Sequence, residues 1–102
     1  MYDVAVGVPY TNCDDDLKKF NEIIYATRED EALAICCGYY LCGKKAFGFM
    51  QNSGLGNCID IITSLIRPYG INIDWYIAYR DSPEHHALMG KIQQRLLGLL
   101  DE

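Results

Sequence analysis

The stretch Met50-Gln51-Asn52-Ser53-Gly54-Leu55-Gly56-Asn57 connects an apolar, strand-like run to an amphipathic, helix-like run that ends at Ile66. A strand that turns through such residues into a helix brings backbone N–H groups and short polar side chains around a ligand. The glycines let the backbone approach that ligand, and the helix start adds a partial positive charge. Because the dinucleotide-binding pattern and the Walker lysine are both missing, an ordinary strand–helix turn is the alternative interpretation.

The segments on either side of this turn alternate between β-rich and helix-like patterns. We expect strands at Val4–Val8, Glu22–Ala26, Ala46–Met50 and Ile71–Tyr79, and helices at Cys13–Phe20, Glu29–Cys42, Leu55–Ile66 and Glu84–Leu100. Gly43 is placed to cap the second helix, and the last helix carries on one face Leu88, Ile92, Leu96 and Leu99. The alternation predicts an α/β fold, a parallel sheet with helices on both faces.

Polar and glycine-containing segments follow all four expected strands, where each strand gives way to a helix. They are Gly7–Thr11, Thr27–Glu29, Gln51–Ser53 and Arg80–His86. Open parallel sheets bind their ligands at this edge, so we expect the four segments to converge there. On the α/β pattern and the glycine turn alone, a flavodoxin-like nucleotide-binding module is also consistent with the sequence.

The length of 102 residues predicts a single domain that covers residues 1–102. A net charge of −5, with the Lys and Arg residues scattered, argues against a nucleic-acid partner. No apolar run approaches the roughly 20 residues that cross a bilayer, and the N-terminus lacks the pattern of a signal peptide. We therefore expect a cytoplasmic protein that binds neither nucleic acid nor membrane.

The chain has five cysteines and no CxxC pair; they are Cys13, Cys36, Cys37, Cys42 and Cys58. Zinc and iron–sulfur sites need closely paired ligands, so we expect no metal bound by these cysteines. Buried, reduced thiols that pack as small apolar side chains explain them best.

Several motifs occur in a fixed order: Gly7-Val8-Pro9, Glu29, Ala32-Leu33-Ala34, Gly38-Tyr39-Tyr40-Leu41, Gly43-Lys44, the Met50–Asn57 turn and Thr63-Ser64-Leu65. Together they resemble the pyrimidine-binding domain of thiamine-diphosphate-dependent decarboxylases, most of all the phosphonopyruvate and sulfopyruvate decarboxylases and the alpha subunit of the latter. The resemblance extends from Val4 to about Gly90. It implies a truncated, pyrimidine-domain-like fold, because the family's first helix and its closing strand and helix have no counterpart.

The resemblance implies catalytic roles for Glu29 and His85. In the family, a helix-opening glutamate faces N1′ of the aminopyrimidine and promotes the imino form that activates C2 of the thiazolium. Glu29 holds that position; without the resemblance it reads as a charge stabilised by the helix dipole. His85 matches the family's histidine-bearing loop and could shuttle a proton, whereas two solvated histidines are the alternative.

The same resemblance implies the residues around the cofactor and the substrate. Cofactor-binding residues would be Glu29, Gln51, Asn52, Ser53, Gly54, Leu55 and Asn57; substrate-binding residues would be Pro9, Tyr10, Thr11, Arg80 and His86. The chain departs from the family at Tyr10–Thr11, where an acidic residue is usual, and after Arg80, where the loop is shorter. Arg28 and Asp30 replace the Asn and Gly that usually flank the glutamate.

Nothing in the chain resembles the Gly-Asp-Gly motif with which the other domain of these enzymes holds magnesium and the diphosphate. We therefore expect thiamine diphosphate to bind between this chain and a diphosphate-binding partner subunit, in a homo- or hetero-oligomer with Leu55 and Ile59 among the apolar contacts. The predicted function is the alpha-type subunit of a split 2-oxo-acid decarboxylase, a carboxy-lyase acting on a small acidic substrate such as phosphonopyruvate or sulfopyruvate. The alternative is a non-catalytic structural or regulatory subunit that keeps the fold.

Overall fold

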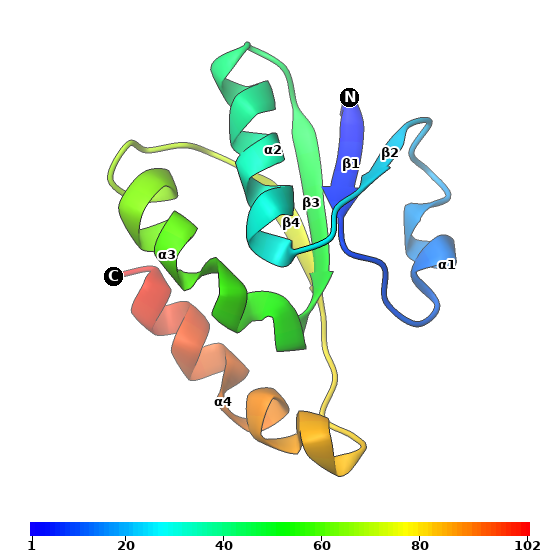
Figure 1. The fold of residues 1–102 in the computed structure, drawn as a ribbon, viewed down its shortest axis with the longest axis vertical. Helices are drawn as coiled ribbons and strands as arrows, with labels where there is room; N and C mark the ends of the chain where they lie inside the picture. Colours follow the sequence, from blue (N-terminus) through cyan, green and yellow to red (C-terminus); the bar gives the residue numbers. More distant parts are fainter.

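The computed structural model describes residues 1–102 and contains one sheet of four parallel strands (Figure 1). In chain order the strands are β1 (Val4–Gly7), β2 (Ile23–Tyr25), β3 (Ala46–Gln51) and β4 (Asp74–Ala78). They lie in the order β2–β1–β3–β4, and every neighbouring pair is parallel. The predicted α/β class and the parallel sheet are confirmed.

Strand β4 is shorter than the expected run of Ile71–Tyr79. Its one neighbour in the sheet is β3, which begins at Ala46 and pairs Phe47 with Asp74. The chain before β4 therefore has almost no strand to pair with, despite its β-forming residues.

Helices cover both faces of the sheet, as predicted, but unequally. Helix α1 (Cys13–Leu17) lies alone on one face, where Cys13 and Leu17 pack with Ala5 and Phe49. On the other face lie α2 (Glu29–Leu41), η1 (Asn52–Cys58), α3 (Ile59–Ile61), η2 (Ile62–Ile66) and α4 (Glu84–Leu100) (Figure 1). Alternate residues of β1 pack on opposite faces of the sheet, because successive side chains of a strand point in opposite directions.

Helix α2 begins and ends as its sequence predicts. Before its first residue, the N–H and the hydroxyl of Thr27 donate hydrogen bonds to Oε1 of Glu31, at 2.8 and 3.1 Å. After its last residue, Gly43 adopts a φ of 75°, and the N–H of Lys44 donates to the carbonyl of Tyr39 at 2.9 Å. This left-handed glycine is the expected helix stop.

The expected single helix over Leu55–Ile66 is wrong. The segment begins as the 3₁₀ helix η1, continues as the single α-turn α3 and ends as the π-helix η2, in which the N–H of Arg67 bonds to the carbonyl of Ile62. Gly54 and Gly56 both favour other conformations over the α-helix, and burial of the turn keeps it tightly wound.

Helix α4 has the predicted boundaries, but its leucine-rich face is not the packed one. Leu88 and Leu99 are 68% and 65% exposed, whereas the buried residue of the helix is Gln93. No helix, α4 included, combines the length and the apolar character that crossing a membrane requires.

All five cysteines are free, and four of them are buried. The expectation of buried thiols fails for Cys42, which is exposed because it follows the last turn of α2.

Candidate functional site at the ends of the strands

Segments that follow three of the strands are joined by side-chain hydrogen bonds at one edge of the sheet. Nδ2 of Asn52, just after β3, donates to the backbone carbonyl of Arg80, just after β4, at 3.0 Å. Nη2 of Arg80 donates to the carbonyl of Thr11, after β1, at 2.9 Å. The expected convergence is therefore observed for the segments after β1, β3 and β4. We call the rim the set of residues Thr11, Glu29, Asn52, Gly54, Asn57 and Arg80.

Glu29, the first residue of α2, joins the segment after β2 to the turn after β3. Nδ2 of Asn57 donates to its Oε1 at 2.7 Å. A Cβ atom on Gly54 would overlap Cγ, Cδ and Oε2 of Glu29, whereas one on Gly56 would meet nothing. Gly54 is therefore the glycine that a close approach requires, and it is the Glu29 carboxylate that approaches it.

The charged neighbours of Glu29 bond elsewhere. Arg28 and Asp30 form an exposed ion pair with each other at 3.0 Å, and this pairing lowers the pKa of Asp30. Hydrogen bonds from Thr27 likewise lower the pKa of Glu31. The two residues that depart from the family pattern thus neutralise each other, and Glu29 keeps Asn57 as its hydrogen-bond partner.

The residues under the turn are fully packed. The thiol of Cys58 lies 3.6 Å from the carbonyl of Gly54, and burial, with smaller effects from Glu29 and Asp30, raises its pKa to about 12. Leu55 has no exposed surface, so its expected role as an exposed pairing contact is wrong: the tight turn directs its side chain into the protein. Ile59 is 40% exposed.

Asn52 has a partner that the sequence interpretation missed. Its Nδ2 donates to Oε1 of Gln93 on α4 at 2.7 Å, and both side chains are buried. Oδ1 of Asn52 is buried without a partner. The signal in the sequence is weak, because Gln93 differs from the exposed Gln94 beside it only in its position on the helix.

The other predicted site residues make local contacts. Nε2 of Gln51 donates to Oγ of Ser53 at 2.8 Å. The hydroxyl of Tyr10 donates to Asp16 on α1 at 2.7 Å; burial, and then this bond, raises the pKa of Tyr10. Pro9 is exposed.

His85 and His86 begin α4, with ring centroids 4.0 Å apart. His85 is exposed, and Nδ1 of His86 is buried without a partner. Neither side chain forms a hydrogen bond or ion pair with the rim, and the first turn of α4 lies beyond the ends of the strands (Figure 1). The histidines are therefore not bonded to Glu29.

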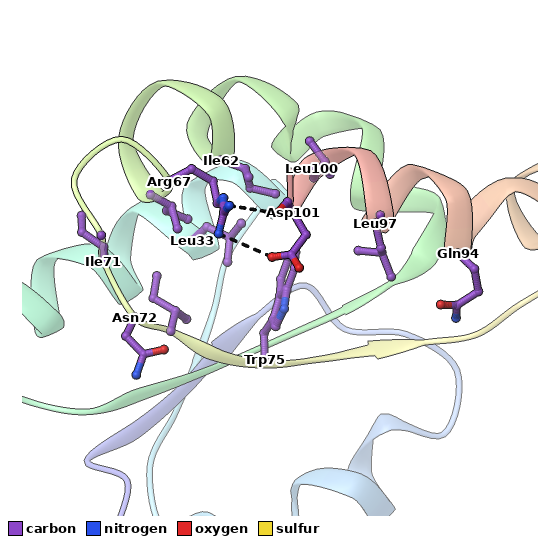
Figure 2. A pocket seen from close by; sticks show the side chains of 14 residues that line it. Leu33, Ile62, Arg67, Ile71, Asn72, Trp75, Gln94, Leu97, Leu100 and Asp101 are labelled. Carbon is purple, nitrogen blue, oxygen red and sulfur yellow. Dashed lines mark hydrogen bonds and ion pairs between the residues drawn. The ribbon is translucent and has the colours of Figure 1, made fainter.

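A pocket of about 690 Å³ lies elsewhere, between η2, the start of β4 and the end of α4 (Figure 2). We call it the apolar pocket; its lining includes Leu33, Ile62, Ile66, Trp75, Leu97 and Leu100. Arg67 crosses it, donating to the carbonyl of Asp101 at 2.9 Å and lying 3.4 Å from its carboxylate. The pocket holds no candidate nucleophile or acid–base pair, so the rim is the candidate site.

No model of a known protein family matches the sequence. The alpha subunit of sulfopyruvate decarboxylase from Methanocaldococcus jannaschii is 43% identical over 83 residues, which are 76% of this chain and 49% of that subunit. The corresponding subunit from Methanothermobacter thermautotrophicus is 31% identical over 97% of this chain and 66% of its own length. Phosphonopyruvate decarboxylase from Streptomyces hygroscopicus is 40% identical over 74% of this chain and 20% of its own length.

The chain thus spans about half the length of the first of these relatives, and less of the Streptomyces enzyme. The matched residues, the parallel sheet and the converging strand ends agree with the resemblance carried by the Met50–Asn57 turn. The chain therefore belongs to the family of the sulfopyruvate decarboxylase alpha subunits and the phosphonopyruvate decarboxylases.

Proposed function

We propose that this chain is the pyrimidine-binding, alpha-type subunit of a split 2-oxo-acid decarboxylase, located in the cytoplasm, and that Glu29 is its cofactor-activating acid. One observation carries the proposal. The Glu29 carboxylate lies over the bare Cα of Gly54 and is held through Oε1 by Asn57. A helix-dipole charge needs neither a glycine beneath it nor an amide to orient it.

The residues present fit the pyrimidine end of thiamine diphosphate. The partly exposed Glu29 carboxylate, the exposed amide of Asn57 and the exposed hydroxyl of Ser53 are the polar groups that an aminopyrimidine would meet. When bound, the cofactor supplies an electron sink for loss of carbon dioxide from a 2-oxo acid. Glu29 would exchange a proton with the ring, Asn57 would orient Glu29, and the turn from Gln51 to Leu55 would contact the ring through backbone and short side chains.

The partner that we propose is a diphosphate-binding subunit. The chain contains no group of three or more His, Cys, Asp or Glu residues that could hold a metal ion. Magnesium and the diphosphate would then be bound by the partner. The relatives named as alpha subunits support an assembly with a second type of subunit.

The substrate that we propose is a small acidic 2-oxo acid such as sulfopyruvate or phosphonopyruvate. Arg80 provides a guanidinium at the rim of a chain whose net charge is −5. Such a group binds carboxylate, sulfonate or phosphonate oxygens through paired N–H donors. Pro9, Tyr10, Thr11 and His86 would complete the substrate side, and His85 would move a proton there.

A non-catalytic subunit is the second candidate. Two observations favour it: His85 forms no hydrogen bond with the rim, and the Tyr10 hydroxyl is bonded to Asp16 on α1. If this alternative holds, the chain keeps the fold in the assembled complex, and Glu29 does not take part in proton exchange with the cofactor.

Replacement of Glu29 separates the two candidates. Glu29→Gln in the complex co-expressed with the partner should slow C2–H exchange of the cofactor and decarboxylation by about 10²–10⁴-fold, because an amide cannot exchange the proton. Glu84→Gln is the matched control, since Glu84 also opens a helix, α4, and is exposed. Unchanged C2–H exchange in Glu29→Gln would mean that Glu29 acts only as a charge stabilised by the helix dipole, and it would favour the non-catalytic subunit.

Calorimetry on the chain alone tests the need for a partner. We expect at most weak binding of thiamine diphosphate, with or without magnesium, because no metal-ligand cluster is present. Tight, magnesium-dependent binding to a verified monomer would contradict the split-subunit proposal.

A further inference from the structure

Gln93 is the buried residue of α4, with 5% of its surface exposed. Its Oε1 accepts a hydrogen bond from Asn52, which has no exposed surface. Two buried amides lose their hydration, and the oxygen of one of them, Oδ1 of Asn52, finds no donor in return. Two apolar side chains at these positions would hold α4 against the turn without losing hydration. Stabilisation of the fold alone therefore does not explain the Asn52–Gln93 pair.

The pair fixes the orientation of the Asn52 amide. Nδ2 carries two hydrogens, and it donates both to Oε1 of Gln93 and to the backbone carbonyl of Arg80. Gln93 therefore holds the amide in the orientation in which it bonds to the segment after β4.

Helix α4 contacts the same segment directly. A Cβ atom on Gly90, one turn before Gln93, would come within 2.9 Å of the Arg80 carbonyl. The hydroxyl of Tyr79 donates to the Gly90 carbonyl at 3.3 Å, and the guanidinium of Arg80 reaches Thr11 at 2.9 Å. A chain of contacts thus runs from α4 through Asn52 and the Arg80 backbone to the substrate side of the rim.

We propose that Gln93 is a positioning residue: through Asn52 it fixes the backbone at Arg80, and so the guanidinium that binds the acidic end of the substrate. The inference rests on the proposed function, which assigns Arg80 to the substrate. It predicts that loss of the Gln93 acceptor affects substrate binding more than the chemical step.

Gln93→Met removes the acceptor and keeps the length of the side chain. In the assembled complex, with sulfopyruvate and phosphonopyruvate as substrates, we expect KM to rise about tenfold and kcat to change little. The exposed Gln94→Met is the matched control and should leave KM unchanged. On an Arg80→Met background, Gln93→Met should add nothing further. A loss confined to kcat, or an additive effect with Arg80→Met, would overturn the proposal.

Hydrogen exchange gives a readout that does not need activity. Gln93→Met should speed amide exchange at residues 79–82 and 52–57, whereas Gln94→Met should not. Unchanged exchange in Gln93→Met overturns the proposal whatever the kinetics. A wild-type complex inactive on both substrates contradicts the proposed function and the role of Arg80 in it, and the exchange data still decide whether Gln93 holds the Arg80 segment.

Discussion

The rim and the apolar pocket differ in position and in chemistry: the rim lies at the ends of the strands, and the pocket lies between η2, the start of β4 and the end of α4. The rim is polar, its members bond to one another, and beneath it Leu55 and Cys58 are buried. The apolar pocket is open, with a volume of about 690 Å³, and a single exposed ion pair crosses it (Figure 2). The pocket supplies empty volume, whereas the rim supplies the carboxylate, amide and guanidinium groups.

Empty volume alone therefore does not locate a site in this chain. The pocket lies toward the start of β4, away from the strand ends where parallel sheets bind ligands. The rim shows the costly features, namely a carboxylate over a glycine and a buried amide with an unpartnered oxygen. Such features are retained where they serve a function.

The largest expected effect comes from a charge under the rim. Leu55→Asp should lower the free energy of unfolding by on the order of 5 kcal/mol, because it buries an unpaired carboxylate in place of a fully buried side chain. Urea unfolding followed by circular dichroism measures the change. Ile59→Asp, at a position 40% exposed, is the control and should cost far less. A folded Leu55→Asp variant that merely dissociates from its partner would show that the floor of the rim is an exposed contact after all.

A methyl group added in the rim should lower the decarboxylation rate more than the free energy of unfolding. Gly54→Ala places a Cβ where the Glu29 side chain lies, and Glu29 must swing away from Asn57. We expect about a 100-fold loss of decarboxylation in the assembled complex, since displacements near 1 Å have that effect. Gly56→Ala, which meets nothing, should retain activity. Equal activity of the two variants would show that decarboxylation does not depend on the approach of Glu29 to Gly54.

Alkaline pH should destabilise the chain through its buried thiols. Burial raises the pKa of both Cys36 and Cys58 from 9.0 to about 12. Above pH 9 the thiols of the unfolded chain ionise while those of the folded chain stay protonated, so the free energy of unfolding should fall between pH 9 and 12. Urea midpoints under reducing conditions should show a shallower fall for Cys58→Ala, whereas Cys42→Ser, at an exposed site, should match the wild type. Identical profiles for all three proteins would mean that Cys58 is accessible to solvent.

The smallest expected effect is a gain at the apolar pocket. Gly98 lies inside α4 and lines the pocket, and a Cβ there meets nothing. Gly98→Ala should raise the free energy of unfolding by about 1 kcal/mol through helix propensity and leave activity unchanged. Gly43→Ala, with a φ of 75°, should instead lose about 1 kcal/mol. A loss of decarboxylation in Gly98→Ala would show that the pocket takes part in function.

Local patterns were enough to predict the start and stop of α2, the boundaries of α4 and the parallel sheet. They failed for Leu55–Ile66, where burial and two glycines overrode the apolar period of a helix. They also failed for α4, whose predicted apolar face is exposed at Leu88 and Leu99 while Gln93 is buried. Periodicity indicates that residues share a face, but the neighbours in space decide which face is covered.

Strand and helix signals and the Met50–Asn57 motif are local in the chain, so they were sufficient to predict the fold class, the family and the edge at which the candidate site lies. Three features depend on folding in three dimensions: Glu29 approaches Gly54 and not Gly56, Leu55 is core, and Gln93 reaches Asn52 across 41 positions. Contacts between residues so distant in sequence depend on how helices pack on the sheet. That packing is set by the shapes of many side chains at once, and no single motif encodes it.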